Sequence, residues 1–507
     1  MAIALVLSAA GTARSEILPE QVLVVFNSQA GDASALKDSY LAAHPDIPPE
    51  NVFDLNRNTI LTSNLSHAAY KSQIRDPIRD YLLSGTGPGP SDILAIVLIR
   101  PIPHRLQDTD NGPVGDNPNN ANTEFSAGDA TFGSIDAELT LLWQELDAGE
   151  AGGQMDSFAD NMIDNPYHTS MSGVDTFDRT NIMTAKSFLN RSNIAWIPNG
   201  AGATLLTPGD MYLVCRIDGT TLADAEATIE RARALRVNKA LVRIILDEFN
   251  VSTNQDLDDD RLFTTNDPFR AGDDYEETAA ILSADGWDVR YDGTFDFISS
   301  AEETMPIIAY ASYGENHDAV AGLGEDPPGT ATYIDGFNFP PGAIFNTIES
   351  YNGRALNGLG TAAGLEQLAD FITAGGTFAV GNVWEPFSFS IPDNEFLFVN
   401  FLVHGMTWGE AAYASLPCLS WQQIVVGDPL AKAVILNDPG LPKGDLNGDG
   451  NVNGLDIASY VDLVLNGPAA YYAAFPALDP VARGDFTGDY LVSLDDLADF
   501  LTAVMGG

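Results

Sequence analysis

The sequence predicts an α/β protein with a small all-α module at its C-terminal end. Short apolar, β-branched runs alternate with amphipathic segments along most of the 507 residues. This alternation is typical of mainly parallel sheets flanked by helices. Two Asp-rich repeats near the C-terminus break the pattern and have the spacing of calcium loops. A chain of this length is too long for one core, so we expect several domains.

Composition excludes several classes of function. With 45% hydrophobic and 9% aromatic residues the chain can bury real cores. Its 71 acidic against 24 basic residues, a net charge of -47, would repel nucleic acid and anionic membranes, so neither is expected as a partner. Residues 1–15 are predicted to be a signal peptide, because residues 1–13 form an apolar run that ends in small residues, although it lacks a basic start. We therefore expect export, and no later segment is apolar for long enough to span a membrane.

Residues 17–147 are predicted to form an N-terminal α/β domain. Its strands are expected at Gln21–Asn27, Asn51–Leu55 and Asp92–Ile99, and its helices at Ala33–Ala43, Ser66–Leu83 and Ser134–Trp143. Ser134 is a suitable N-cap for the last of these helices. Residues 101–133 are rich in Gly, Pro, Asn and Asp and predict a long surface loop. Residues 148–205 read as an irregular connection.

Residues 206–436 are predicted to form a second, larger α/β domain, followed by a linker at 437–443. Strands are expected at Met211–Ile217, Leu241–Leu246, Trp287–Tyr291, Pro306–Tyr313, Ala343–Thr347, Thr377–Val383 and Gln423–Val426. Helices are expected at Thr221–Leu235, Tyr275–Leu282, Ala362–Thr373, Glu395–Val403 and Trp408–Ala414. Cys215 lies in an apolar run and reads as a buried thiol, with a disulfide to Cys418 as the alternative.

The C-terminal repeats, within residues 444–507, carry the strongest motif. Positions 1, 3, 5, 7, 9 and 12 of the first loop are Asp445, Asn447, Asp449, Asn451 (through its carbonyl), Asn453 and Asp456. These are hard oxygen ligands in the order that surrounds calcium, and Gly450 stands at position 6, where the turn needs positive φ. In the second loop the same positions hold Asp485, Thr487, Asp489, Leu491 (carbonyl), Ser493 and Asp496. Tyr490 replaces the glycine there, and a left-handed non-glycine residue costs roughly 1–2 kcal/mol. We therefore expect two calcium ions, the second bound more weakly.

This duplicated loop-helix pattern, with Asp at position 12 and no helix predicted before the loop, resembles the type I dockerin module. The resemblance implies docking to a cohesin domain, read by loop positions 10 and 11. Those positions are Gly454 and Leu455 in one repeat and Leu494 and Asp495 in the other. A calcium-stabilised cap without a protein partner is the alternative.

Two predicted strand ends in the second domain could carry chemistry, because ligands of α/β sheets bind beyond the carboxyl ends of the strands. They are A-Y-A-S-Y-G-E-N-H at 309–317 and F-N-T-I-E-S-Y-N-G at 345–353. With Q-I-V-V-G-D-P-L at 423–430 they resemble the caspase-like domain of gingipain-type cysteine peptidases. That likeness puts Tyr313 in the place of the catalytic histidine and Ser350 in the place of the cysteine. Tyrosine is a poor base at neutral pH, so the body is expected to lack the Cys/His dyad.

Three alternatives remain for the body. Ser350 paired with His317 would make a peptidase-like hydrolase, with His404 as a further histidine to consider. Glu349 and Glu385 could act as paired carboxylates of a polysaccharide-degrading glycoside hydrolase, a reaction that dockerin-bearing proteins often perform. A binding or surface-assembly role needs neither.

A broader resemblance spans residues 17–434. The segments V-L-V-V-F-N, S-I-D-A-E-L-T-L-L-W, Y-L-V-C-R-I-D-G and L-S-W-Q-Q-I-V-V-G-D-P-L are similar to an uncharacterised bacterial family that accompanies exosortase-sorted (PEP-CTERM) proteins. This resemblance implies a bacterial protein that is secreted, periplasmic or on the cell surface, and it implies no activity.

Overall fold

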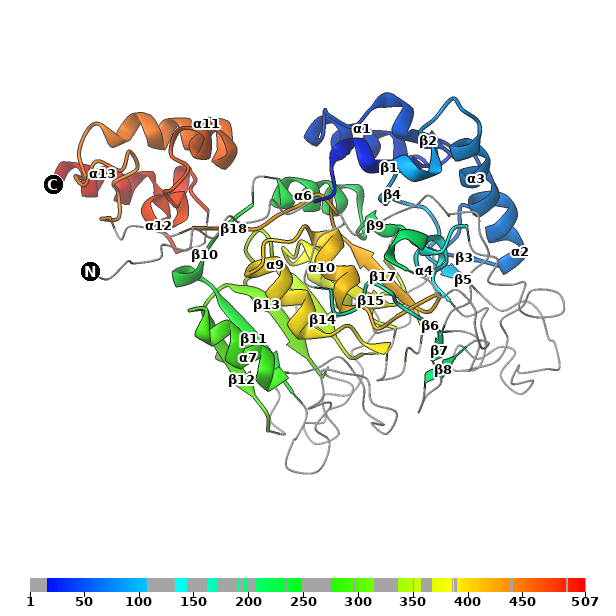
Figure 1. The fold of residues 1–507 in the computed structure, drawn as a ribbon. Coiled ribbons are helices and arrows are strands. Elements are labelled where there is room, and N and C mark those ends of the chain that lie inside the picture. The colour runs from blue at the N-terminus through cyan, green and yellow to red at the C-terminus, as the bar shows by residue number, and fades with distance from the viewer. Residues whose placement is uncertain are drawn as a thin grey trace, which may run out of the picture.

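In the computed structural model a ten-stranded sheet runs through the body of the molecule (Figure 1). Its strands, in spatial order, are β12 (Asp288–Asp292), β11 (Arg243–Asp247), β13 (Ile307–Ser312), β14 (Ile344–Thr347), β15 (Phe378–Asn382), β17 (Gln423–Val426), β9 (Leu213–Ile217), β4 (Ala95–Ile99), β1 (Val22–Phe26) and β2 (Val52–Asp54). The structure describes residues 16–106, 133–143, 162–170, 189–191, 196–198, 207–233, 235–248, 275–294, 298, 300–313, 336–349, 351–356, 367–384, 386, 390–436, 441–488 and 491–506. The expected signal peptide lies outside these residues.

The sheet is mainly parallel, as the sequence predicted. Neighbouring strands pair in parallel throughout, except β15 and β17, which are antiparallel. The prediction of a separate sheet for each α/β unit is wrong. Strand β9 of the second unit pairs with β4 of the first over Ala95–Ile99, so both units share one sheet. Sequence patterns do not specify which distant strands become neighbours, so the sequence alone could not show that the two units share a sheet.

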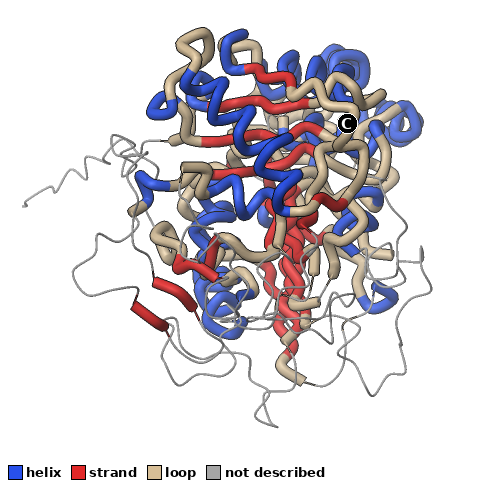
Figure 2. The backbone as a smooth tube through the Cα atoms, turned by 90° about the vertical axis from the view of Figure 1, so that its right-hand side faces the viewer, coloured by secondary structure: helices blue, strands red, loops and turns tan. Residues whose placement is uncertain are grey.

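Helices cover both faces of the sheet, which explains the continuous apolar runs in its strands. Successive residues of β11 alternate between two cores: Ile245 belongs to the core under α8, whereas Ile244 and Leu246 belong to the core that includes α7 and α10. Figure 2 shows the strands in the middle of the body with helices on their flanks. The body helices are α1 (Ala33–Ala43), α2 (His67–Tyr70), α3 (Asp76–Leu83), α4 (Ile135–Thr140), α6 (Leu222–Ala232), α7 (Tyr275–Ala284), α8 (Gln367–Thr373), α9 (Asn400–Leu402) and α10 (Trp408–Ser415).

Local capping fixes several helix starts. Ser134 accepts a hydrogen bond from the Ala137 amide, so its predicted role as N-cap is confirmed. Thr221 and Asp224 form a capping box at the start of α6. Between α2 and α3 the chain stays helical through a π-helical segment at Lys71–Arg75, within the single helix expected at Ser66–Leu83.

Three small sheets lie outside the large one. They pair β10 (Arg236–Asn238) with β18 (Val434–Leu436), β3 (Asn64–Leu65) with β5 (Arg105–Leu106), and β16 (Cys418–Leu419) with β6 (Met162–Asp164), β7 (Leu189–Arg191) and β8 (Trp196–Pro198). The last sheet corrects the prediction that 148–205 is wholly irregular. The prediction of a surface loop from residue 101 is also wrong for its first part, because residues 101–106 are almost entirely buried.

The C-terminal tail, residues 441–506, forms a helical unit beside β10 and β18 (Figure 1). Its helices are α11 (Asp456–Ala474), α12 (Pro480–Gly484) and α13 (Leu497–Gly506). Helix α11 is interrupted at Gly467, whose φ of 78° is followed by Pro468. The tail has its own apolar core, which includes Leu446, Tyr460 and Phe500. No helix of the described residues is long and apolar enough to cross a membrane.

Candidate functional site

The first Asp-rich loop closes around its two end carboxylates. Asp445 accepts hydrogen bonds from the amides of Gly448 (2.8 Å) and Asp449 (3.2 Å) on Oδ1 and from Gly450 (2.8 Å) on Oδ2. Asp456 accepts from the amides of Asn447 (3.1 Å) and Asn453 (2.8 Å). Both aspartates are 0% exposed, and Gly450 has the expected positive φ of 88°.

The second loop has the same construction. Asp496, also 0% exposed, accepts from the amides of Phe486 (2.7 Å), Thr487 (2.9 Å) and Ser493 (2.8 Å). Burial alone would raise the pKa of Asp496, but the hydrogen bonds from Ser493 and Thr487 outweigh it and lower the pKa below its usual range. The carboxylate is thus held in its charged form. Asp489 and Tyr490 lie outside the described residues, so positions 5 and 6 stay predictions.

The two loop-helix units pack against each other through equivalent residues. Tyr460 and Phe500 occupy the same place in the two repeats, and their rings stack at 4.2 Å between centroids. Gly444 and Gly484, which precede the loops, each face a valine of their own loop, Val452 and Val492 respectively. The sequence predicted no helix before the loops, but the short helix α12 precedes the second one.

The donor set of the loops fits calcium in chemical type. Each expected ligand is an oxygen from a carboxylate, amide, hydroxyl or backbone carbonyl, the ligands a hard cation prefers. Asp445 and Asp456 form no ion pair with any described residue, and buried charges are normally paired or bound to metal. Within the described residues no group of three or more His, Cys, Asp and Glu side chains is close enough to hold a metal. The expected set of the first loop has three carboxylates and takes its remaining ligands from Asn447, Asn451 and Asn453.

The positions expected to contact a cohesin are on the surface. Leu455, at position 11 of the first loop, is 67% exposed, and Leu494, at position 10 of the second, is 69% exposed. Helix α11 adds three exposed apolar side chains at helical spacing, Ile457, Val461 and Leu465. We call Leu455, Ile457, Val461 and Leu465 the apolar stripe. Tyr460 and Leu463 of the same helix are buried.

In the body, the predicted strand ends do meet at the carboxyl edge of the sheet, because β13 and β14 are neighbours. Tyr313 follows β13, is fully buried, and donates its amide to the Asp247 carbonyl of β11 (3.0 Å). A base that exchanges protons with a substrate needs access, which burial denies to Tyr313. Ser350 and His317 lie outside the described residues, so the structure does not test the proposed pair.

The turn after β14 is held in an unusual conformation. Tyr351 has a φ of 63°, a left-handed conformation that costs a non-glycine residue about 1–2 kcal/mol. Its amide donates to the Trp384 carbonyl (3.0 Å), and the Asn352 side chain bridges Thr347 Oγ1 (2.9 Å) and the Asn382 amide (2.6 Å). Strained backbone of this kind persists only where surrounding contacts hold it, and it is often found at functional sites.

The structure brings a histidine to this turn that sequence reasoning missed. His104 is fully buried beyond the end of β4, and its Nε2 lies 2.8 Å from the Arg354 carbonyl. Burial, together with the nearby Arg216 and Arg105, holds the pKa of His104 well below its usual range. The sequence signal that could have indicated His104 is its position shortly after an apolar strand. His404, considered from sequence, instead contacts Asn400 Oδ1 (3.0 Å).

The remaining candidates are the paired glutamates and the two cysteines. Glu349 is 0% exposed and Glu385 lies outside the described residues, so the structure gives no carboxylate separation. Cys215 is fully buried, as expected for a buried thiol, and the structure forms no disulfide between Cys215 and Cys418.

Comparisons with known proteins do not identify a family for this chain. No protein-family model matches the chain, and no curated protein matches significantly. Among solved structures, the Arg-specific cysteine proteinase gingipain R (RgpB) aligns with 83% of this chain and 80% of its own, at 8% identity and a TM-score of 0.38.

Proposed function

We propose that the tail is a calcium-binding docking module of the dockerin type, carried by an exported protein. The observation that carries the proposal is the pair of buried carboxylates in the first loop, Asp445 and Asp456. They receive only backbone N–H hydrogen bonds and lack a cationic partner among the described residues. A bound cation would offset the cost of burying them.

Calcium in the first loop would be held by Asp445, Asn447, Asp449, the Asn451 carbonyl, Asn453 and Asp456. Asp485, Thr487, Asp489, the Leu491 carbonyl, Ser493 and Asp496 would hold the second ion. Bound metal neutralises the clustered carboxylates. A unit of about 60 residues has a small core, so this electrostatic contribution decides whether the tail folds.

The experiment is calorimetric titration of the full chain with calcium. Asp445→Ala should remove the tighter site and Asp485→Ala the weaker one. Asp462→Ala is the matched control, because Asp462 lies on α11 and contacts Asn466 rather than a loop. Wild-type protein that gives no calcium heat, or an Asp445→Ala variant that binds as wild type does, would contradict the proposal.

For docking, we propose the apolar stripe as the surface that meets a cohesin-type domain. An exposed row of four apolar side chains is unusual in a chain of net charge -47. Val461→Asp should weaken binding to a cohesin by at least tenfold, because it would bury an unpaired charge. Asp499→Asn on α13 serves as the control. If no cohesin in a diverse set binds the calcium-loaded chain, the tail is a cap rather than a docking module.

A peptidase-like hydrolase is the second candidate for the body, favoured by the strained turn at Tyr351. Ser350 directly precedes this residue, and His104 contacts the same turn through Arg354. Fluorophosphonate probes label activated serines, so wild-type labelling that disappears in Ser350→Ala would support it. A wild-type chain that neither labels nor cleaves a broad peptide library is not a serine hydrolase.

A further inference from the structure

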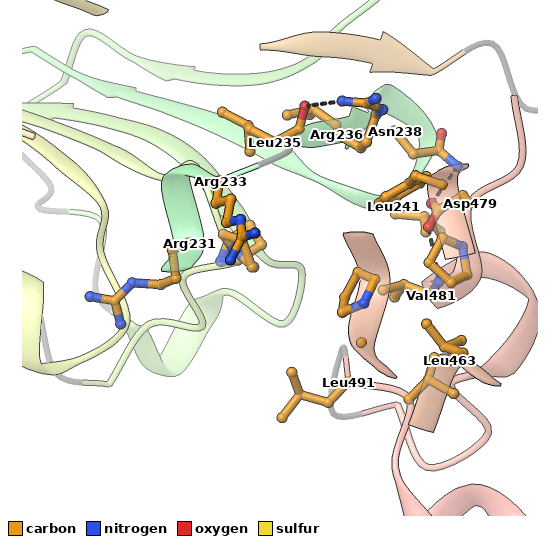
Figure 3. A pocket seen from close by; sticks show the side chains of 18 of the residues that line it. Arg231, Arg233, Leu235, Arg236, Asn238, Leu241, Leu463, Asp479, Val481 and Leu491 are labelled. Atoms are coloured by element: carbon orange, nitrogen blue, oxygen red, sulfur yellow. Dashed lines mark hydrogen bonds between the residues drawn. The ribbon is translucent and has the colours of Figure 1, made fainter. Parts of the chain in front are cut away.

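A cavity of about 330 Å³ lies between the body and the tail (Figure 3). This is at the lower end of the roughly 300–1,000 Å³ typical of small-molecule sites. The body side is formed by the end of α6 and by β10, and the tail side by α11, α12 and the second loop. The apolar lining on the two sides includes Leu235, Val242, Ile308, Leu463, Val464 and Val481.

Few polar contacts join the two sides. Asn238 Nδ2 donates to Asp479 Oδ2 (3.0 Å), and the Arg236 guanidinium lies 5.0 Å from the centre of the Tyr472 ring. Asp479 is already engaged, because its Oδ1 also caps α12 at the Val481 amide (2.9 Å). These contacts between the body and the tail leave the cavity unfilled.

Three arginine side chains lie at this cavity. Arg231, Arg233 and Arg236 all line it, in a chain that has about three acidic residues for each basic one. None of the three forms an ion pair with a described residue. Arg236 donates to the Leu235 carbonyl (3.2 Å), and its Nε is buried without a hydrogen-bond partner. Figure 3 shows Arg231 turned away from the tail, and its guanidinium donates to the Ile372 carbonyl (3.1 Å).

We propose that this cavity binds a small amphipathic monoanion, an alkyl or aryl carboxylate. Arg236, whose Nε is buried without a hydrogen-bond partner, would bind the carboxylate through charge-assisted hydrogen bonds, and the exposed Arg233 would add favourable charge. The apolar part would pack between Leu235 and Val242 on the body and Leu463 and Val464 on the tail. Glu230 and Asp479 also line the cavity, and their charge disfavours anions of higher valence.

The ligand would contact the body and the tail at once. Because a ligand stabilises the arrangement that it binds, its presence would favour the docked position of the tail. This inference is independent of calcium binding and of any cohesin.

The test is titration of the full chain with octanoate, octanol and octylammonium, which share one chain length and differ in charge. We expect saturable one-to-one binding of octanoate, at least tenfold tighter than octanol, and no binding of octylammonium. The double variant Arg233→Gln/Arg236→Gln should lose at least tenfold in octanoate affinity and keep its octanol affinity. Arg290→Gln, on the exposed edge strand β12, should bind octanoate as wild type does.

A second variant, Val464→Trp, fills the cavity without changing charge and should abolish octanoate binding. Equal affinity for octanoate and octanol, absence of octanoate binding, or unchanged binding in the double arginine variant would each overturn the proposal. Titrations with and without calcium separate the two ideas. Octanoate binding without any calcium binding would contradict only the calcium module, and the reverse result would contradict only the cavity site.

Discussion

Removing the Arg216 guanidinium should destabilise the body more than any single surface change. Arg216 is fully buried on β9 and donates to both carboxylate oxygens of Asp136 (2.6 and 2.7 Å) and to Asp218 (2.7 Å). Asp136 lies on α4, in the first predicted unit, so this ion cluster joins the two halves of the chain. Asp136 and Asp218 are themselves 1% and 0% exposed.

The magnitude follows from what Arg216→Met would leave behind. Asp136 would stay buried without its cation, and Asp218 would keep only the more distant Arg100 (3.8 Å). Breaking a buried pair in this way costs about 3–5 kcal/mol. Arg290→Met is the control, because its nearer partner, Glu302, is 56% exposed, and its more distant partner, Glu303 (3.7 Å), would keep Arg243 (3.0 Å). Loss of such a surface pair should cost less than about 1 kcal/mol.

Urea unfolding followed by tryptophan fluorescence measures this effect in the body alone. All six tryptophans lie between residues 143 and 421, and the tail has none. A triple variant that adds Asp136→Asn and Asp218→Asn to Arg216→Met should recover part of the lost stability, because it removes the unpaired charges. If Arg216→Met costs no more than Arg290→Met, or if the triple variant is no more stable than the single one, the electrostatic reasoning is refuted.

Three further predictions concern other parts of the molecule. Burial raises the pKa of Asp218 to about 6, despite Arg216; the folded state therefore binds its proton more tightly than the unfolded state, and stability should fall as pH rises from about 4 to 6. In a plot of the urea midpoint against pH, Asp218→Asn should remove the fall between about pH 4 and 6. If the midpoints of wild type and variant differ by the same amount at every pH in this range, the prediction is wrong. Tyr460→Ala removes a buried ring stacked on Phe500 and should destabilise the tail by about 3–5 kcal/mol, measured by circular dichroism melts. Leu465 is 75% exposed, so Leu465→Ala should change the stability of the tail by less than about 0.5 kcal/mol. Equal effects of the two variants would show that the stack is not part of the core. Gly444→Ala places a Cβ 2.7 Å from Val452, at a residue whose φ is 104°, and should therefore weaken calcium binding. Gly454→Ala is the control, because its Cβ meets nothing within 4 Å. Calorimetric titration that finds weaker calcium binding in Gly454→Ala than in Gly444→Ala would contradict this.

The strands were predictable from sequence where both of their faces are buried. The runs at Val22–Phe26, Ala95–Ile99 and Leu213–Ile217 are continuously apolar because helices cover both sides of the sheet. The pairing of Cys215 with Val97 was not predictable, since nothing in either run identifies its neighbour. The three-residue strands β6, β7 and β8 are too short to show a period.

The two candidate sites differ in how far sequence could specify them. A calcium loop is local: twelve consecutive residues supply the ligands and the turn, so Asp445 and Asp456 could be named before any fold was known. The site at the carboxyl edge of the sheet, around the turn after β14, is assembled from distant segments. Its buried histidine, His104, comes from a part of the chain that composition assigned to a surface loop. His104 is buried because residues 101–106 pack beneath the turn after β14, as its contact with Arg354 shows.

The protonation of His104 limits what it could do at that turn. Its lowered pKa keeps the imidazole neutral at pH 7, which is the form a general base requires. A carbonyl can only accept, so the 2.8 Å contact with Arg354 requires the proton to be on Nε2. The lone pair is then on Nδ1, and any proton accepted from a nucleophile must be accepted there. His104 is as fully buried as Tyr313, and its Nε2 already holds the chain at Arg354, so Nδ1 could exchange a proton only with another buried group and not directly with a substrate from solvent.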